Sequence, residues 1–339
     1  MKAAFLAKQD EFVVSDLPDP AVEGWAVVRT KAAGVCGTEL HILDGMIEPP
    51  HFPFVMGHEA AGVVVSTPTG SSVKPGDRVA IYNMIGCGKC QWCRSGNEQV
   101  CLDPVGQLGF TLDGTFSDLI AIPAENLISL PEQVSFADAA LLSCGGMTAV
   151  HAIRLGNVSL GDTVVVNGVG GVGLMAIQVA FAAGARVIAI ADSAEKAALA
   201  SDAGAFHVVV LDDEGYAAVP TKVKEATGGV GATHFIELVG TSASMLAGIR
   251  SLARHGAFVS IGYTKEEFAF HPIELILSEI RILSSVAASR RDLEAAIRLC
   301  ADGRLTTVID TRYALADVEV ALDRLRARQV SGRNVLVWE

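Results

Sequence analysis

Residues Thr163–Asp192, "TVVVNGVGGVGLMAIQVAFAAGARVIAIAD", constrain the fold of this chain more than any other stretch. A β-branched run precedes the glycines, an apolar helix-forming run follows them, and a second β-branched run ends in an acidic residue. The G-x-G-x-x-G pattern permits a tight strand-to-helix turn, a close backbone approach to a pyrophosphate and close packing of helix on strand. The block therefore predicts a β–α–β unit whose helix N-terminus faces the phosphates of a dinucleotide. The candidate cofactor-binding residues are Gly168, Gly170, Gly171, Gly173 and Asp192.

The alternation of strands and helices continues beyond this block. From residue 161 to about 286, β-branched runs alternate with amphipathic runs, which is the pattern of a parallel sheet covered on both faces. From residue 1 to about 140, short apolar runs are separated by Gly, Pro and Asp, which indicates an irregular β-rich domain. The last run, "GRNVLVWE", predicts a strand that returns to this first domain. At 339 residues, the chain is expected to be an α/β protein of two domains. One comprises residues 1–145 and is completed by residues 287–339, and the other is a doubly wound domain of residues 146–286.

The acidic residue after the second strand bears on the choice of nucleotide. Asp192 lies roughly 20 residues past the glycines, where a carboxylate can accept hydrogen bonds from the ribose 2′-hydroxyl of NAD and repel the 2′-phosphate of NADP. Asp192 and Glu195 also fit a D-x-x-E capping box at the start of the next helix. Both interpretations stay open, and NAD is the preferred cofactor, with NADP as the alternative.

Four of the seven cysteines lie in "CGKCQWCRSGNEQVC", the four-cysteine lobe (residues 87–101). Their C-x2-C-x2-C-x7-C spacing brings four thiolates within reach of one tetrahedral zinc ion. An iron–sulfur cluster is the main alternative, but its last cysteine usually follows closely and before a proline. A thioredoxin-like redox pair fits less well, because the run does not open a helix after a strand, and the odd cysteine total disfavours a disulfide framework. We predict a closed structural zinc site on Cys87, Cys90, Cys93 and Cys101.

Three further metal-ligand types stand far apart in the first domain: Cys36, His58 and Cys144, with Glu59 beside the histidine. Two thiolates and one imidazole leave one open position on a tetrahedral ion, which is typical of a catalytic zinc site. Taken singly, each residue also has a structural interpretation, as a small buried hydrophobe or a core histidine whose hydrogen bonds are satisfied.

The motifs that carry these residues occur together and in one order. "GVCGTELH", "GHEAAGVV", the four-cysteine lobe, "KPGDRVA", "SCGGMTAVHA" and "GVGGVG" closely resemble the zinc-dependent medium-chain alcohol dehydrogenases of the medium-chain dehydrogenase/reductase superfamily, over the whole chain. The resemblance implies a GroES-like catalytic domain completed by the C-terminus, and a Rossmann domain between. It also implies catalytic zinc on Cys36, His58 and Cys144, and therefore two zinc ions per chain.

The resemblance further implies roles for residues around the catalytic zinc. The glutamate matching Glu59 sits next to the metal and can enter its coordination. The residues matching Thr38 and His41 carry the alcohol proton outward past the cofactor ribose. Oxidation of an alcohol removes a proton and a hydride; zinc supplies the acidity without changing oxidation state, so the electrons go as hydride to the nicotinamide.

Three positions depart from the family pattern. The aspartate that usually orients the zinc histidine is Glu39 here, one methylene longer, so the contacts behind the ligand are expected to be rearranged. Gly37 replaces a cation that contacts the pyrophosphate in some relatives. Counted back from Lys196 without a gap, the family's ribose aspartate falls on Ala191, and only a one-residue shift places it on Asp192.

Composition and charge limit the partners. A formal net charge of -12, without any block of Lys and Arg, argues against binding of nucleic acid or of an anionic membrane surface. No apolar run reaches membrane-spanning length and no secretory signal is evident, so a cytoplasmic protein is expected. By family analogy we expect a homo-oligomer, a tetramer or else a dimer.

The expected function is therefore that of a zinc-dependent alcohol dehydrogenase or carbonyl reductase that moves a hydride between an alcohol carbon and a nicotinamide. A polyol, an amino alcohol or a hydroxyacyl compound in the same family is the nearest alternative substrate. An alternative from a different class is a redox sensor that binds zinc and nucleotide without turnover.

Overall fold

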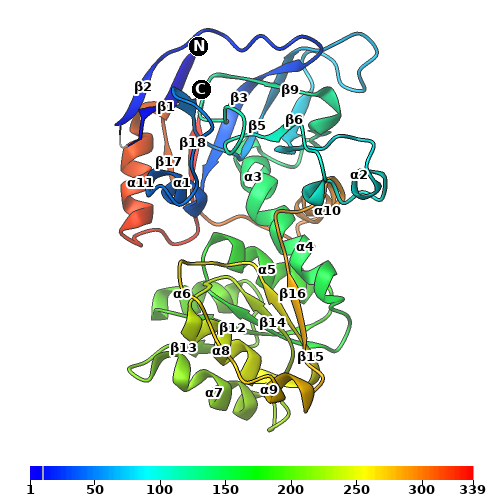
Figure 1. The fold of residues 1–339 in the computed structure, drawn as a ribbon, viewed down its shortest axis with the longest axis vertical. Coiled ribbons are helices and arrows are strands. Elements are labelled where there is room, and N and C mark those ends of the chain that lie inside the picture. Colours follow the sequence, from blue (N-terminus) through cyan, green and yellow to red (C-terminus); the bar gives the residue numbers. More distant parts are fainter. Residues whose placement is uncertain (10, 339) are drawn as a thin grey trace. The chain divides into compact units, whose positions relative to one another are not determined.

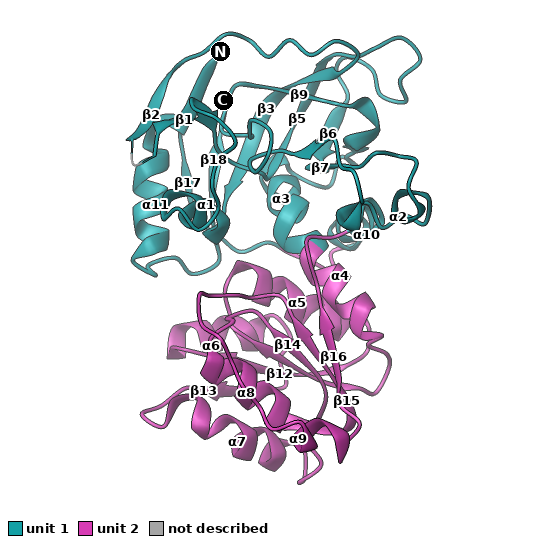
Figure 2. Cartoon of the chain, viewed as in Figure 1, with its two compact units in different colours: residues 1–147, 289–302, 307–339 teal, residues 148–288, 303–306 magenta. Residues whose placement is uncertain are grey.

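The computed structural model of the chain describes residues 1–9 and 11–338. Two compact units divide the chain, and Figure 2 colours them separately. Unit 1 comprises Met1–Met147, Ser289–Asp302 and Thr307–Glu339, and unit 2 comprises Thr148–Ala288 and Gly303–Thr306. The C-terminal part of the chain therefore belongs mainly to the same unit as its N-terminal part.

Unit 2 is built on a six-stranded parallel sheet (Figure 1). Its strands are β11 (Thr163–Asn167), β12 (Arg186–Ala191), β13 (His207–Val210), β14 (Ala232–Glu237), β15 (Leu252–Ser260) and β16 (Arg281–Ser284). Their spatial order is β13-β12-β11-β14-β15-β16. The order reverses between β11 and β14, which is the point where open α/β sheets bind dinucleotides at the carboxyl ends of their strands. The predicted α/β class with a doubly wound sheet is confirmed.

Helices connect the strands of this sheet, as parallel pairing requires. They are α5 (Gly171–Ala182), α6 (Ala194–Asp202), α7 (Val219–Ala226), α8 (Ser242–Ser251) and α9 (Ile273–Ile276), with a 3-10 turn at Gly215–Ala217. The central strands are apolar throughout because they are buried on both faces: Val164, Val165 and Val166 have no exposed surface. Phe235 and Phe258 stack between β14 and β15 with ring centroids 5.7 Å apart.

Unit 1 is β-rich (Figure 1). A three-stranded sheet has the order β2 (Glu11–Asp16), β1 (Lys2–Lys8) and β4 (Phe54–Val55). A seven-stranded sheet has the order β10 (Leu127–Ser129), β6 (Arg78–Ile81), β5 (Ala60–Ser66), β3 (Ala26–Val35), β18 (Arg333–Val337) and β17 (Ile309–Tyr313), and β9 (Leu119–Ile122) also pairs with β3. β7 (Met84–Ile85) and β8 (Gly106–Gln107) form a two-stranded antiparallel sheet.

The C-terminal strand completes the large sheet. β18 pairs antiparallel with β3, and Asn334 lies opposite Val35. Because the strands are antiparallel, the residue before Asn334 lies level with the residue after Val35. Arg333 is therefore level with Cys36, the first residue after β3. The helices of unit 1 are α1 (Gly37–Leu43), α2 (Gln91–Arg94), α3 (Phe136–Leu141), α10 (Arg290–Ala301) and α11 (Val318–Arg326), with 3-10 turns at Glu98–Val100, Ala124–Asn126 and Leu315–Asp317. The helix α4 (Met147–Gly156) follows α3 and belongs to unit 2 from Thr148 onward.

One helical stretch meets the length and hydropathy of a membrane span. Phe136–Gly156 runs through α3, a π-helical turn at Leu142–Gly146, and α4, with a mean hydropathy of 1.3 in its most apolar window. That window is 83% buried inside the protein, as in the core helix of a globular fold. Asp138 and Arg154 interrupt the stretch, so it is not an uncharged apolar run of spanning length.

The buried His234 in β14 makes unit 2 sensitive to acid. Its Nε2 donates to the Gly156 carbonyl at 2.9 Å, and its Nδ1 lies 2.9 Å from the Thr233 hydroxyl. Burial lowers the pKa of His234. The folded state therefore binds fewer protons than the unfolded state below about pH 6.5, so this histidine's contribution to stability is lost as the pH falls through that value.

We expect His234→Gln to reduce the loss of unfolding free energy between pH 7.5 and pH 5.5, as measured by urea denaturation at both pH values. His207→Gln, which replaces an exposed histidine on β13, is the matched control and should leave the wild-type loss unchanged. An H234Q protein with the wild-type pH dependence would contradict this account.

Candidate active site

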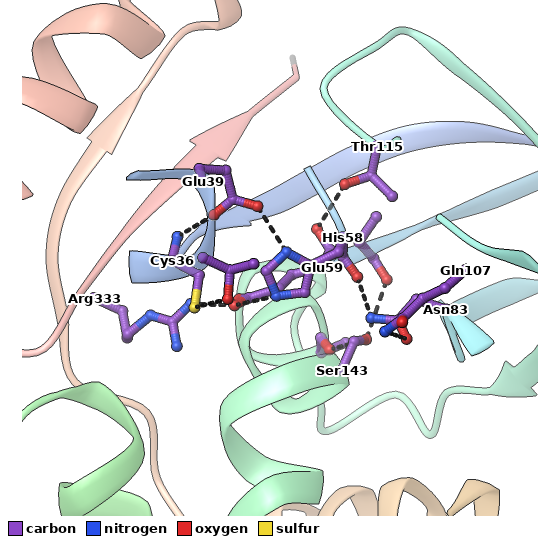
Figure 3. A network of polar contacts seen from close by, with 12 residues as sticks. Cys36, Glu39, His58, Glu59, Asn83, Gln107, Thr115, Ser143 and Arg333 are labelled. Carbon is purple, nitrogen blue, oxygen red and sulfur yellow. Dashed lines mark hydrogen bonds and ion pairs between the residues drawn. The ribbon is translucent and has the colours of Figure 1, made fainter. Parts of the chain in front are cut away.

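Cys36 stands where β3 ends and α1 begins, and it is the N-cap residue of α1. The side chain of Glu39, three residues later, accepts a hydrogen bond from the Cys36 backbone N–H at 2.8 Å. The two residues form a capping box, which fixes the position of Cys36 at the start of the helix. The Cys36 thiol points toward His58 and Glu59 in Figure 3.

His58 and Glu59 come from the residues that precede β5, and both are buried. Cys144 lies in the π-helical turn Leu142–Gly146. A π-helical turn adds one residue to a helical segment and is frequent at functional sites, because it redirects a side chain that a regular helix would place elsewhere. The hydroxyl of Ser143 donates to the Ala139 carbonyl at 2.9 Å, one turn earlier.

The structure gathers these residues into one cluster. The ligand atoms of Cys36, His58, Glu59 and Cys144 all lie within 4.8 Å of one another. Two sulfurs, one imidazole nitrogen and a neighbouring carboxylate are a donor set that suits Zn²⁺, with three protein ligands and one open position. The residues present therefore fit a catalytic zinc ion.

Glu39 ties two members of this cluster together (Figure 3). One carboxylate oxygen accepts from the Cys36 backbone, and the other lies 2.6 Å from Nδ1 of His58. With Nδ1 occupied, Nε2 is the histidine nitrogen that remains for a metal. The Glu39 side chain thus reaches the histidine and closes the capping box with the same carboxylate.

Contacts within the cluster shift the pKa values of its two thiols in opposite directions. A hydrogen bond from Cys144 lowers the pKa of Cys36, and burial opposes it. The pKa of Cys144 rises correspondingly, through the same hydrogen bond and through burial. Burial disfavours the charged form of His58, but Glu39 and Cys36 outweigh it and raise the pKa of that histidine. The shift at Cys36 favours its thiolate, the form in which cysteine binds metals.

Glu59 is a fully buried carboxyl group beside the cluster. Its Oε1 lies 3.6 Å from Nε2 of His58, and burial raises its pKa to about 7. Room for the carboxylate exists because residue 34 is glycine: a Cβ there would lie 1.9 Å from Glu59 Oε2. A larger residue at this position of β3 would displace the carboxylate.

Arg333 is a site residue that the sequence reasoning missed. It is 5% exposed, and its guanidinium donates to Oε1 of Glu59. The sequence signal was a charged residue at the start of the mainly apolar strand "RNVLV". Nothing local shows its partner, because the two residues are 274 positions apart and meet only through the pairing of β18 with β3.

Thr38 and His41 both lie on α1, one turn apart, so they share a face of the helix. The Thr38 hydroxyl is 3.7 Å from the Cys36 sulfur. Both side chains are partly exposed. The structure thus places the expected proton-carrying residues on the helix that Cys36 begins.

The four-cysteine lobe forms a second cluster in unit 1. The Sγ atoms of Cys87, Cys90, Cys93 and Cys101 all lie within 4.8 Å of one another, and those of Cys90 and Cys101 are 3.9 Å apart. Four sulfurs around zinc at about 2.3 Å from the ion would be separated by about 3.8 Å. The lobe therefore fits a structural zinc ion, and all seven cysteines of the chain are free thiols, without a disulfide framework.

Backbone N–H groups of the lobe point at its sulfurs. Cys90 N–H donates to Cys87 Sγ at 3.3 Å, and Cys93 N–H to Cys90 Sγ at 3.5 Å. Hydrogen bonds from the backbone of Cys93 and Leu102 lower the pKa of Cys90 to about 6. Arg291 of α10 fastens the lobe by donating to the Ser95 carbonyl at 2.6 Å.

The glycine fingerprint of unit 2 forms a turn between β11 and α5. Gly168 has φ +100°, a conformation that side chains rarely adopt, and Gly170 is the N-cap of α5 without a side-chain cap. A Cβ on Gly170 would meet no atom of residues 1–9 and 11–338 within 4 Å, whereas one on Gly173 would lie 1.8 Å from the Gly168 carbonyl oxygen. Gly171 is the first residue of α5. The open space at Gly170 and the uncapped helix N-terminus fit a pyrophosphate.

Substitutions of Gly173 and Gly170 are expected to affect stability and nucleotide binding differently. We expect Gly173→Ala to lower the unfolding free energy by about 1–3 kcal/mol, because the new methyl group collides with backbone, and to weaken NAD binding. Gly170→Ala should keep wild-type stability yet lose NAD affinity, since its methyl group would occupy space open to the nucleotide. Thermal unfolding and calorimetric titration with NAD measure both effects. Equal destabilisation of the two variants would contradict the assignment.

Asp192 follows β12 directly, and its side chain is 49% exposed. Ala191, the alternative position for the ribose carboxylate, is buried as the last residue of the strand. The N-cap of α6 is Ser193, whose hydroxyl accepts from the Lys196 backbone at 3.3 Å. The capping interpretation of Asp192 is therefore wrong, because the helix begins one residue later. Asp192 instead pairs with the Lys196 ammonium at 2.9 Å.

Known families match both units. A family described as "Alcohol dehydrogenase GroES-like domain" matches residues 22–132, and one described as "Zinc-binding dehydrogenase" matches residues 171–302. The chain is 32% identical to an alcohol dehydrogenase of Geobacillus stearothermophilus over 341 aligned positions, covering 99% of both chains. It is also 32% identical to an NAD-dependent alcohol dehydrogenase of Sulfolobus acidocaldarius, again over 99% of each.

A solved structure gives the same result. The crystal structure of the alcohol dehydrogenase from the archaeon Aeropyrum pernix superimposes with a TM-score of 0.92 at 29% identity and covers 100% of both chains. The family matches, the two relatives that align from end to end and the shared fold all indicate the same family. The two cysteine-containing clusters described above agree with it. This chain belongs to the zinc-type medium-chain alcohol dehydrogenases, oxidoreductases that act on alcohols.

Proposed function

We propose that this protein is a zinc-dependent alcohol dehydrogenase that uses NAD and, in the reverse direction, reduces carbonyl compounds. The cluster of Cys36, His58 and Cys144, with Glu39 on the far nitrogen of the histidine, is the observation that carries the proposal. Zinc bound there would make the substrate hydroxyl acidic, and bound nicotinamide would accept the hydride. The chain's own residues hold these groups and move the proton.

Each residue of the cluster has one task in this proposal. Cys36, Cys144 and Nε2 of His58 would hold the metal, and Glu39 fixes the tautomer and orientation of His58. The Thr38 hydroxyl accepts the proton of the substrate alcohol while donating its own toward His41, which lies one turn further along α1. Proton and hydride then leave the alcohol by separate routes, as oxidation to a carbonyl requires.

Glu59 and Arg333 balance the charge behind the metal ligands. Two thiolates beside a dication leave no net charge, so an isolated carboxylate there would be an uncompensated buried anion. The Arg333 guanidinium compensates it through the contact with Glu59. Because its carboxylate lies among the ligand atoms of the cluster, Glu59 would be a further oxygen donor to the metal, and this is the role we assign to it.

The nucleotide site is proposed on Gly168, Gly170, Gly171 and Gly173, with the α5 N-terminus toward the pyrophosphate. The half-exposed Asp192 at the end of β12 supports NAD over NADP, because its carboxylate is placed to accept from a ribose hydroxyl. The alternative sensor function lacks support, since the relatives described above are named as enzymes.

The quaternary and cellular settings are also part of the proposal. Free cysteines throughout the chain support the reducing cytoplasm as its location. Exposed apolar side chains on α9 and on the edge strand β16, including Ile276 and Ile282, support a homo-oligomer, a tetramer or else a dimer.

The proposed function is tested by measuring turnover with a panel of compounds. The panel contains primary, secondary, cyclic and aromatic alcohols, polyols, amino alcohols and hydroxyacyl compounds, together with their carbonyl counterparts. Zinc-loaded protein should oxidise at least one class of alcohol with NAD at a higher kcat/KM than with NADP. Nucleotide binding without turnover of any compound in the panel would overturn the proposed function and favour the sensor.

A further inference from the structure

Glu237 is a fully buried carboxyl group that the proposed mechanism does not use. It is the last residue of β14, at the carboxyl end of the sheet, beside the point where the strand order reverses. Burial raises its pKa, but every hydrogen bond it makes is to a donor. A buried carboxyl group with several donors is costly to replace, because the donors would lose their acceptor.

One oxygen of Glu237 organises the loop that follows its own strand. Oε1 accepts from the backbone N–H groups of Val239 and Gly240, at 2.7 and 2.8 Å, and from the Ser244 hydroxyl at 3.2 Å. Ser244 belongs to the capping box that opens α8 together with Thr241. Glu237 therefore fixes the path of the chain from β14 into α8.

The other oxygen reaches the neighbouring strand. Oε2 accepts from the side-chain amide of Asn167 at 2.8 Å, and Asn167 is the last residue of β11, directly before the glycine turn. The loop held by Oε1 packs against that same turn. A Cβ added to Gly168 would lie 3.1 Å from a Val239 methyl group, and one added to Gly173 would lie 3.5 Å from a Leu238 methyl group. One carboxylate thus links the two strand ends that border the switch point.

We infer that Glu237, acting through Asn167 and the 238–241 loop, is a positioning residue that holds the glycine turn in the conformation that accepts the dinucleotide. The inference rests on the proposed nucleotide site. Because open α/β sheets bind dinucleotides outside these strand ends, a loosened turn would misplace the backbone N–H groups aimed at the pyrophosphate. Glu237 belongs to unit 2, whereas the proposed metal ligands belong to unit 1, so its loss is expected to change nucleotide binding rather than chemistry.

A second polar link on the same two strands provides a matched control. The Thr233 hydroxyl bonds to both the N–H and the carbonyl of Thr163, each at 3.0 Å. Thr163 and Thr233 lie at the amino ends of β11 and β14, away from the glycine turn. Thr233→Val therefore removes a link between the same strands at the end that does not face the nucleotide.

The test compares Glu237→Ala, Glu237→Gln and Thr233→Val in the full-length, zinc-loaded protein. Calorimetric titration gives the Kd for NAD, steady-state kinetics gives kcat and the KM for NAD, and thermal unfolding gives stability. We expect E237A to raise both the Kd and the KM for NAD by about 10- to 100-fold, with kcat at saturating NAD changed less than about threefold. E237Q should restore most of the affinity for NAD. The side-chain oxygen of the glutamine can accept from the loop N–H groups, and the Asn167 side chain can rotate so that its oxygen accepts from the glutamine NH2 group.

T233V separates positioning from stability. It should lower the unfolding temperature and leave the Kd for NAD at the wild-type value. The inference is overturned if E237A keeps the wild-type Kd for NAD, or if T233V weakens NAD binding as much as E237A does. A wild-type protein that fails to bind NAD in the same titration would instead refute the proposed function, which keeps the two failures distinct.

Discussion

Replacing Cys36 with serine is expected to abolish alcohol oxidation and to remove one zinc ion per chain while the lobe keeps the other. In the proposed site, Cys36 is the ligand whose thiolate form is favoured, because the hydrogen bond from Cys144 lowers its pKa. Without it, the remaining donors are one imidazole, one thiol and a carboxylate that is engaged by Arg333. A metal ion contributes several kcal/mol of charge stabilisation to such a reaction, so kcat/KM should fall at least about 1000-fold.

Elemental analysis of the purified proteins, together with initial rates, measures this effect. Wild-type protein should contain two zinc ions per chain and Cys36→Ser protein one. Cys300→Ser is the matched control: Cys300 lies on α10, burial raises the pKa of its thiol to about 11, and it belongs to neither cluster. It should keep both metals and full activity. A C36S protein that retained two zinc ions and wild-type turnover would contradict the catalytic assignment.

Breaking the ion pair between Arg333 and Glu59 is expected to give the largest loss of stability from a single substitution. Arg333→Met removes the compensating cation and leaves a fully buried carboxyl group without it. Removal of one partner of a buried pair costs about 3–5 kcal/mol, whereas replacement of both partners by apolar groups is close to neutral. The double variant Glu59→Met/Arg333→Met should therefore recover most of the unfolding free energy that Arg333→Met loses.

Urea denaturation of zinc-loaded wild-type, R333M, E59M and double-variant proteins completes a double-mutant cycle. Arg326→Met is the matched control, because Arg326 pairs with Asp44 at 2.7 Å on the surface, where both side chains are 48% exposed. An exposed pair contributes at most about 1 kcal/mol. If R333M were no more destabilised than R326M, the account of Glu59 as a compensated buried charge would be wrong.

The fold was predictable to the extent that its signals are local. The strand, glycine turn, helix and second strand of residues 163–191 lie within one contiguous block, and the structure places β11, α5 and β12 there. Periodicity and glycine spacing suffice for such a block because each element interacts first with its sequence neighbours. The short helix α7 was not anticipated, since its segment "VPTKVKEA" is polar and carries an early proline.

The capping interpretation of Asp192 shows where local signals mislead. Asp-Ser-x-x-Lys and Asp-x-x-Glu overlap in "DSAEK", and both Asp192 and Ser193 are good capping residues. The helix begins after Ser193 because β12 extends through Ala191 and pairs with Val210 of β13. The length of the strand pairing, which depends on residues in β13, therefore decided which residue capped the helix.

The order of the elements, the residue types of the proposed metal ligands and the position of the glycine turn could all be read from the sequence, because spacing over a few residues encodes each of them. Which distant groups meet depends on the folded chain. The pairing of β18 with β3 brings Arg333 to Glu59 across 274 residues, and the π-helical turn aims Cys144 at Cys36. Such contacts depend on long-range pairing and on burial, whose effects on charge and orientation appear only when the whole sheet has formed.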